Sequence, residues 1–321
     1  MRASKPLKSD ASAPILITMG DPSGIGPEVA VAAYRQLSGA VGERPLRLVG
    51  DPDVFRAFGD IPDHALFATG SAKSREMGKA NPDNAPAILA AIKDSVEEAQ
   101  SGGAAAIVTA PIHKASLLES GFAYPGHTEY LQHLTKAPRA VMMLAGGALR
   151  VVPLTIHLPY VEVPKHVTKD AIVETGAIVL EALELDFGLG HPRLAVAGLN
   201  PHAGEQGAIG SEETEIIRPA IEALRARGHT VEGPLSADSM FHAEARIRYD
   251  AALCMYHDQA LVPLKTLAFW EGVNVTLGLP IVRTSPDHGT AFDIAGQNKA
   301  DPRSMVAAIR LAAAIANARQ R

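Results

Sequence analysis

Three histidines in the sequence share one local setting, because each comes just after a short apolar stretch. His157 lies in TIHLPY, His202 in GLNPHAGEQG and His257 in CMYHDQ. Neutral imidazole is a common ligand of zinc and other divalent ions. Three protein ligands with an open fourth position are typical of a catalytic metal site, whereas four ligands close a structural zinc site. The alternative is that each histidine only caps its own loop through a hydrogen bond, since the spacing is too wide for a local metal motif.

A second group of residues is cationic or lies beside glycine. Its members are Lys114 in TAPIHK, the pair His127 and Thr128 in GHTEY, Lys265 in YHDQALVPLK, and Arg283 in GLPIVRTSPDHG. Beside a bound metal, such groups suit an anionic substrate such as a phosphate or a carboxylate. The alternative for each of the cations is ordinary surface charge.

Two glycine-rich stretches are candidate ligand loops. Residues 20–28 (GDPSGIGPE) lack the Gly-Lys-Ser/Thr of a phosphate-binding loop, and Val29 stands where the dinucleotide fingerprint needs a third small residue. This pattern indicates only a tight turn. Residues 288–296 (HGTAFDIAG) contain one acid, Asp293, which could accept hydrogen bonds from a ribose diol or cap a helix.

Other polar and aromatic residues have more than one interpretation. Asp238 and Asp258 are carboxylates that could orient a ligand or a base. Cys254 is interpreted as a small core residue rather than a nucleophile, and Trp270 as a packing residue.

The elements that must position these residues alternate between short β-branched runs and longer helical patterns. Ligands gather after the carboxyl ends of strands in α/β sheets, which is where the three histidines fall. This alternation predicts an α/β protein with a largely parallel sheet. The expected strands are 15–18, 46–49, 105–109, 150–156, 194–199 and 251–256, and the expected helices are one from Pro27 and those at 84–100, 168–185, 212–227 and 302–318.

Length and composition exclude several classes of protein. The 321 residues suggest two domains, and 47% hydrophobic residues are enough for a sizeable core, which excludes general disorder. A net charge of −5 without a basic run argues against a nucleic-acid partner, and one cysteine argues against a disulfide framework. No stretch is long and apolar enough for a membrane helix, and residues 1–13 lack the apolar core of a signal peptide. We therefore expect a cytoplasmic protein with no membrane partner.

Taken together, the motifs resemble the 4-hydroxythreonine-4-phosphate dehydrogenase family of pyridoxal phosphate biosynthesis. The resemblance runs from about residue 15 to the end, through GDPSGIGPE, TAPIHK, GHTEYL, HLPY, LNPHAGEQGAIGSEE, ADSMF, YHDQALVPLK and GVNVTLGLPIVRTSPDHGTAFDIAG. The first motif and HGTAFDIAG are also similar to loops of the isocitrate and isopropylmalate dehydrogenases. The resemblance implies a two-lobed α/β/α subunit with mostly parallel sheets and an active site in the cleft between the lobes. We expect a nucleotide-binding lobe at 1–130 plus 275–321, and a metal, substrate and dimerisation lobe at 131–274.

The resemblance also implies roles for single residues. An ionised Asp293 would repel a 2′-phosphate, so NAD is expected as the cofactor, with NADP possible. One divalent ion (zinc, cobalt, nickel or magnesium) is implied for each site, and the family is a homodimer whose site draws residues from both subunits. The implied metal ligands are His157, His202 and His257, the substrate contacts His127, Thr128, Lys265, Asn274 and Arg283, and the cofactor contacts Gly289, Thr290, Asp293 and Ile294.

The reaction implied is oxidation of 4-phosphooxy-L-threonine to a 3-oxo acid that loses carbon dioxide. Lys265, Asp238 and a metal-bound water are the candidates for the base. Two residues depart from the family pattern: His113 stands where asparagine is common, and Ala260 where glycine is common. The alternatives are a paralogue acting on a threonate phosphate or a cyclic dihydrodiol, a metallohydrolase, and a sensor of phosphorylated metabolites.

Overall fold

The computed structural model describes residue 4 and residues 6–321. The chain divides into two compact units: the first unit comprises 4–140 and 273–321, and the second unit contains 141–272. The boundaries after residues 140 and 272 lie ten and two residues from the predicted boundaries after residues 130 and 274. The nucleotide-binding and metal-binding roles assigned to the two lobes remain predictions.

The first unit is built on a sheet with the strand order β2-β3-β1-β5-β12-β11, and β4 pairs with β3. β1 is parallel to β3 and β5, and β12 is parallel to β5, whereas β2 runs antiparallel to β3 and β11 antiparallel to β12. The strands are β1 (Ile15–Thr18), β2 (Ala40–Val41), β3 (Arg44–Gly50), β4 (Leu66–Ala68), β5 (Ala106–Thr109), β11 (Val273–Leu277) and β12 (Arg283–Pro286).

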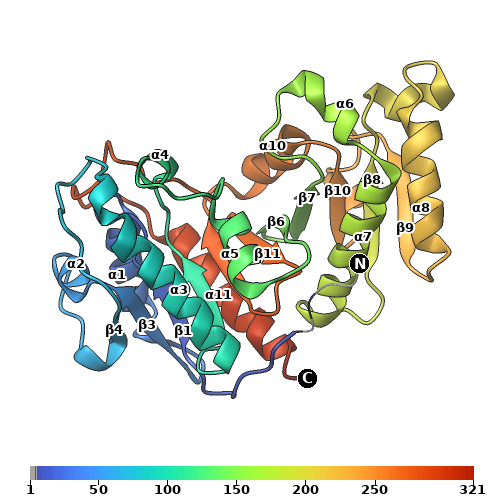
Figure 1. Cartoon of the computed structure of the whole chain (residues 1–321). Helices are drawn as coiled ribbons and strands as arrows, with labels where there is room; N and C mark the ends of the chain where they lie inside the picture. The colour runs from blue at the N-terminus through green and yellow to red at the C-terminus, as the bar shows by residue number, and fades with distance from the viewer. Residues whose placement is uncertain (1–3, 5) are drawn as a thin grey trace. The chain divides into compact units, whose positions relative to one another are not determined.

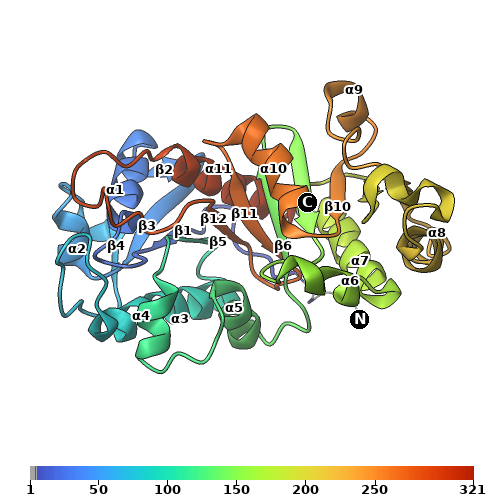
Figure 2. The same ribbon diagram turned by 90° about the horizontal axis from the view of Figure 1, so that it is seen from above.

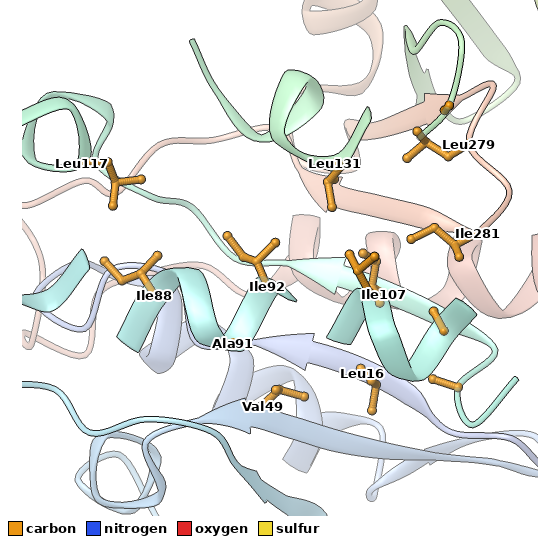
Figure 3. Close-up of a cluster of buried hydrophobic side chains, with 14 of the residues drawn as sticks. Leu16, Val49, Ile88, Ala91, Ile92, Ile107, Leu117, Leu131, Leu279 and Ile281 are labelled. Carbon is orange, nitrogen blue, oxygen red and sulfur yellow. The ribbon is translucent and has the colours of Figure 1, made fainter. Parts of the chain in front are cut away.

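Helices cover both faces of this sheet. Figure 2 shows α1 and α11 on one face and α3, α4 and α5 on the other. Ile88, Ile92 and Val96 are buried at helical spacing along α3, which ends at Gly102 with φ +86°. They pack with residues of the strands in the cluster of Figure 3. The helices are α1 (Gly26–Gln36), α2 (Pro52–Arg56), α3 (Ala85–Ser101), α4 (Lys114–Glu119), α5 (His127–Thr135) and α11 (Arg303–Ala318).

Within the second unit the strand order is β6-β7-β10-β8-β9. β6 and β7 form an antiparallel pair, and β7, β10, β8 and β9 are parallel to their neighbours. α10 packs against β7, β6 and β10, while α7 packs against α8, β6 and β8 (Figures 1 and 2). The strands are β6 (Val141–Gly146), β7 (Leu149–Pro153), β8 (Arg193–Ala197), β9 (Thr230–Leu235) and β10 (Ala251–Cys254), and the helices are α6 (Val163–His166), α7 (Lys169–Leu185), α8 (Arg218–Arg225), α9 (Ala243–Arg246) and α10 (His257–Ala268).

The mixed α/β class with a mostly parallel sheet is confirmed, and so are the predicted elements in most places. The predicted helix 212–227 is instead a π-helical turn at Glu213–Ile217 followed by α8. Pro219, near the start of α8, has no amide hydrogen to donate to the preceding turn. Cys254 is buried as predicted. Trp270 is half-exposed just after α10, and its ring makes an edge-to-face contact with Phe269 at 5.2 Å.

Helices long and apolar enough to cross a membrane are absent from the part of the chain that the structure describes.

Candidate active site

The three histidines follow three neighbouring strands of the second unit. β10 lies between β7 and β8 and is parallel to both. Their carboxyl ends therefore meet at one edge of the sheet, where His157 follows β7, His202 follows β8 and His257 begins α10 directly after β10. The prediction that all three histidines come after strand ends is confirmed.

The structure brings two of the histidines close together. The rings of His157 and His257 have centroids 6.0 Å apart, and both side chains line a cavity of about 180 Å³. Nδ1 of His257 is 2.6 Å from Oδ1 of Asp258, a contact that orients the ring and directs Nε2 away from the carboxylate.

His202 lines a neighbouring cavity of about 660 Å³. Tyr160 and Tyr256 line both cavities, and their rings make an edge-to-face contact at 5.0 Å. Within the described chain, no three His, Cys, Asp or Glu side chains are grouped so that they could hold a metal ion. The imidazole nitrogens of the three histidines are suitable ligands for a divalent ion. In the described chain, however, the three rings are not grouped closely enough to bind one ion together.

Asp238 shares the larger cavity with His202. The hydroxyl of Ser236 donates a 2.7 Å hydrogen bond to Oδ1 of Asp238. This hydrogen bond is the main reason why the pKa of the Asp238 carboxyl group lies below its usual value, and the nearby His202 lowers it further. Asp238 is therefore ionised at neutral pH, as a general base must be. Lys265, the other tentative base, is exposed on α10 in the same unit.

The first unit holds a second candidate site around Arg283, the first residue of β12. Its guanidinium is 3% exposed and donates hydrogen bonds to the hydroxyls of Thr109 (2.6 and 3.1 Å) and Thr276 (2.8 Å). Burial lowers the pKa of Arg283 to about 10. No carboxylate of the described residues pairs with it. A buried guanidinium without a counter-charge is costly, and an anionic ligand would remove that cost.

Two further polar atoms lack partners, one at the start of α5 and one on β11, the strand that pairs with β12. Nε2 of His127 and Oδ1 of Asn274 are buried without a hydrogen bond in the described structure. Burial lowers the pKa of His127 well below its usual value, and the nearby charges of Arg283 and Lys114 add to this. His127 is therefore neutral at pH 7. We call His127, Asn274 and Arg283 the anion site.

The amino terminus of α5 contributes to the same place. His127 and Thr128 are its first two residues, and no side chain caps it. Its first amide groups have no partner within the helix, and such groups suit phosphate. The side chain of Lys114 lies beside Gly126, the residue that precedes the helix. The sequence makes Lys114 a candidate cation but does not assign it to the substrate, because its charge alone does not distinguish it from a surface lysine.

The two glycine-rich stretches of the first unit pack against each other. Ile25 donates its amide hydrogen to the carbonyl of Thr290 at 2.9 Å, and a β-carbon at Gly24 would lie 3.0 Å from the same carbonyl oxygen. Gly289 has open space around it, and Ile294 is half-buried. Asp293 is exposed, and no helix begins there. The helix-capping interpretation of Asp293 is therefore wrong, and its cofactor role remains a prediction.

The stretch 20–28 contains buried polar atoms that the sequence interpretation as a mere turn missed. Oδ1 of Asp21 accepts a 2.9 Å hydrogen bond from the amide of Ser23, whereas Oδ2 of Asp21 and Oγ of Ser23 are buried without partners. Burial raises the pKa of Asp21. No spacing signal distinguishes such a pair from an ordinary turn, so only the structure identifies them.

Comparison with known proteins supports one family. The model of the family "Pyridoxal phosphate biosynthetic protein PdxA" matches residues 42–312. The chain is 52% identical to 4-hydroxythreonine-4-phosphate dehydrogenase of Roseobacter denitrificans, over 96% of this chain and 98% of the relative. It is 46% identical to the enzyme of the same name from Xanthobacter autotrophicus, over 97% and 96% of the two chains.

A solved structure agrees with the sequence relatives. The crystal structure of 4-hydroxythreonine-4-phosphate dehydrogenase from Klebsiella pneumoniae has a TM-score of 0.85 and 38% identity, covering 95% of this chain and all of that one. Both the sequence and the fold thus agree with the resemblance carried by the motifs. The chain belongs to the family of the pyridoxal phosphate biosynthetic protein PdxA.

Proposed function

We propose that the protein is a metal-dependent dehydrogenase that oxidises the secondary hydroxyl of 4-phosphooxy-L-threonine. The product, 2-amino-3-oxo-4-phosphooxybutanoate, then loses carbon dioxide to give 3-amino-2-oxopropyl phosphate. The family and its named relatives support this reaction class. The structural observation that carries the choice of a phosphorylated substrate is the anion site, where Arg283 is buried without a carboxylate partner.

The anion site would bind the phosphate. Arg283 supplies a fixed charge, and neutral His127 has a ring nitrogen that can donate to a phosphate oxygen. Thr128 and the amides of α5 bind the same group at the helix terminus. Lys265 is proposed as a further substrate contact.

The metal would be held by His157, His202 and His257. A divalent ion at this position supplies Lewis acidity, which lowers the pKa of a bound hydroxyl group. Asp258 orients His257. Asp238, ionised next to His202, is positioned in the same cavity to accept the hydroxyl proton.

We propose residues 288–296 as the contact for the nicotinamide cofactor, the acceptor of the hydride. The exposed carboxylate of Asp293 suits a ribose diol and repels a 2′-phosphate, so NAD is preferred. Gly289, Thr290 and Ile294 complete this loop.

A homodimer with shared active sites accounts for two features. The three histidines are not grouped for a metal within one chain, so a partner subunit would complete the site. Large apolar side chains are also exposed along α10 and just after it, a pattern typical of contact surfaces. They are Val262, Leu267, Phe269 and Trp270.

The test combines the protein with 4-phosphooxy-L-threonine, NAD or NADP, and each metal in turn, and follows nicotinamide reduction. We expect reduction that is lost after metal stripping and restored by one of zinc, cobalt, nickel or magnesium. No reduction with any metal would refute the proposal. A threonate phosphate and a cyclic dihydrodiol, run in parallel, distinguish the paralogous activities, because a faster reaction with either would replace the proposed substrate.

The shared site has its own test. Equal amounts of the inactive variants His202→Ala and His257→Ala are mixed, dissociated and reassociated. Recovery of activity in the mixed dimers is expected if one site uses residues of both subunits. A monomer in analytical ultracentrifugation, or no recovery in proven mixed dimers, would contradict sharing.

A further inference from the structure

The three loops that bear the histidines are tied to one another by buried polar side chains. Thr155 follows β7 and is 6% exposed, and its hydroxyl donates a 2.8 Å hydrogen bond to the carbonyl of Met255. Met255 follows β10 and lies two residues before His257. The loop of His157 is thereby joined to the loop of His257.

Gln259 joins the second loop to the third. Its Oε1 accepts a 2.7 Å hydrogen bond from the amide of Met255, and its Nε2 donates a 2.7 Å bond to the carbonyl of Gly198, which follows β8. The side chain is 8% exposed. Because one partner is a donor and the other an acceptor, a side-chain amide meets both requirements and a carboxylate does not.

Glu213 then holds the loop of His202. Its Oε1 accepts 2.7 Å hydrogen bonds from the amides of both Leu199 and Asn200, and its Oε2 accepts a 3.0 Å bond from Nδ2 of Asn200. The carboxylate is buried at 1% exposure and packs directly against Gly204.

The segment that Glu213 supports has an unfavourable backbone. Residues 202–206 all have positive φ, between +41° and +74°, and only one of the five is a glycine. A left-handed residue other than glycine costs about 1–2 kcal/mol, so the surrounding structure must impose this conformation. The bonds to Leu199 and Asn200 fix the start of the segment that presents His202.

We propose that Gln259 is a positioning residue for the metal site, acting with Thr155 and Glu213 to hold the histidine loops in the arrangement that metal binding requires. This inference rests on the proposed metal role of the histidines. Partners of this kind, which orient the ligands without touching the metal, typically change metal affinity by about 10- to 100-fold when they are removed.

The experiment measures metal affinity rather than turnover. Metal-free Gln259→Met is titrated with Co²⁺ in competition with a chromophoric chelator, and the absorption spectrum of the bound ion is recorded. We expect an affinity about 10- to 100-fold weaker than that of the unaltered protein, together with a changed ligand-field spectrum. The thermal stabilisation that a fixed Co²⁺ concentration provides should fall accordingly.

A matched control is available in the first unit. Gln132 also joins two backbone groups, because it donates to the carbonyl of Pro138 and accepts from the amide of Ala140, both at 3.3 Å. Gln132→Met should leave Co²⁺ affinity and the spectrum unchanged. Equal losses of affinity in both variants would show a general loss of stability and overturn the proposal.

Two further variants separate the possible failures. If His202→Ala binds Co²⁺ as tightly as the unaltered protein, the proposed metal site is wrong. If His202→Ala loses the metal but Gln259→Met keeps full affinity, the positioning role alone is wrong. If Gln259→Met does not fold, Thr155→Val tests the proposal instead, because it removes one hydroxyl group at constant side-chain shape. Weaker Co²⁺ binding by Thr155→Val would support the positioning role of these side chains, and unchanged binding would refute it.

Discussion

Arg283→Met should leave the folded protein at least as stable as before while removing its affinity for phosphate. Buried arginine normally stabilises through its contacts, but this guanidinium has only hydroxyl partners, Thr109 and Thr276. Methionine has a similar length and no charge, so it fills the same space without the cost of burying an ion.

The magnitude follows from the lowered pKa. The pKa of Arg283 falls from 12.5 to about 10, and each unit corresponds to about 1.4 kcal/mol, so burial of the charge opposes folding by about 3 kcal/mol. The sign follows because the folded state holds this proton less tightly than the unfolded state. The cost is therefore fully present at every pH below about 10, and it disappears only as pH rises towards 12.5.

The lost hydrogen bonds offset part of this gain. Each is worth about 1 kcal/mol net, so Arg283→Met should raise the free energy of unfolding by about 1 kcal/mol or leave it unchanged. Loss of a charge-assisted contact worth about 3 kcal/mol should raise the KM for 4-phosphooxy-L-threonine by about 100-fold. Inorganic phosphate should stabilise the unaltered protein and not the variant.

The assay is urea unfolding with and without inorganic phosphate, joined to steady-state kinetics. Arg44→Met is the matched control, because Arg44 is also fully buried but binds Asn317 and the carbonyls of Asp10 and Ala13. That variant should keep the response to phosphate. If Arg283→Met loses more than about 2 kcal/mol while phosphate still stabilises it, the guanidinium is structural and the reasoning fails.

Three further outcomes are expected. Gly20→Ala should lower the free energy of unfolding by about 1–3 kcal/mol, because Gly20 has φ +70° and a β-carbon would lie 2.5 Å from the carbonyl oxygen of Pro111. Urea unfolding measures this, and an unchanged midpoint urea concentration would contradict it. Asp293→Ser should raise the ratio of kcat/KM for NADP over NAD by about 10-fold, since one repulsive charge is removed, and a constant ratio would place the cofactor's ribose elsewhere. Asp238→Asn should lower kcat by about 100-fold or more at neutral pH. Because the hydrogen bond from Ser236 lowers the pKa of Asp238, its acid limb in the pH profile should lie below the usual range of a carboxyl group, and a limb in the range of histidine would indicate another base.

Local sequence patterns predicted much of the framework. The apolar spacing of Ile88, Ile92 and Val96 located α3, and the runs before His157, His202 and His257 located β7, β8 and β10. These signals are readable because helix periodicity and strand composition involve neighbouring residues only. The remaining elements were not predicted, and most of them span six residues or fewer: the strands β2, β4, β6, β9, β11 and β12 and the helices α2, α4, α5, α6, α9 and α10.

Partners that are distant in the chain were beyond local patterns. Thr109 and Arg283 are 174 residues apart, and Gln259 and Gly198 are 61 apart. Thr155 and Glu213 lie within the motifs TIHLPY and LNPHAGEQGAIGSEE, but nothing in those motifs assigns either residue a role. Their roles are visible only through the groups that they hydrogen-bond in the folded chain.

The sequence by itself determined the fold class, the family and the residue types of the candidate site, because these depend on composition, periodicity and motifs along the chain. Tertiary structure alone decided that β10 lies between β7 and β8, which brings the three histidine loops to one edge of a sheet. It also decided that Arg283 is buried without a carboxylate. The physical reason is that strand pairing and burial are long-range: the cost of a buried charge depends on which groups surround it, and those groups come from segments far apart in the chain.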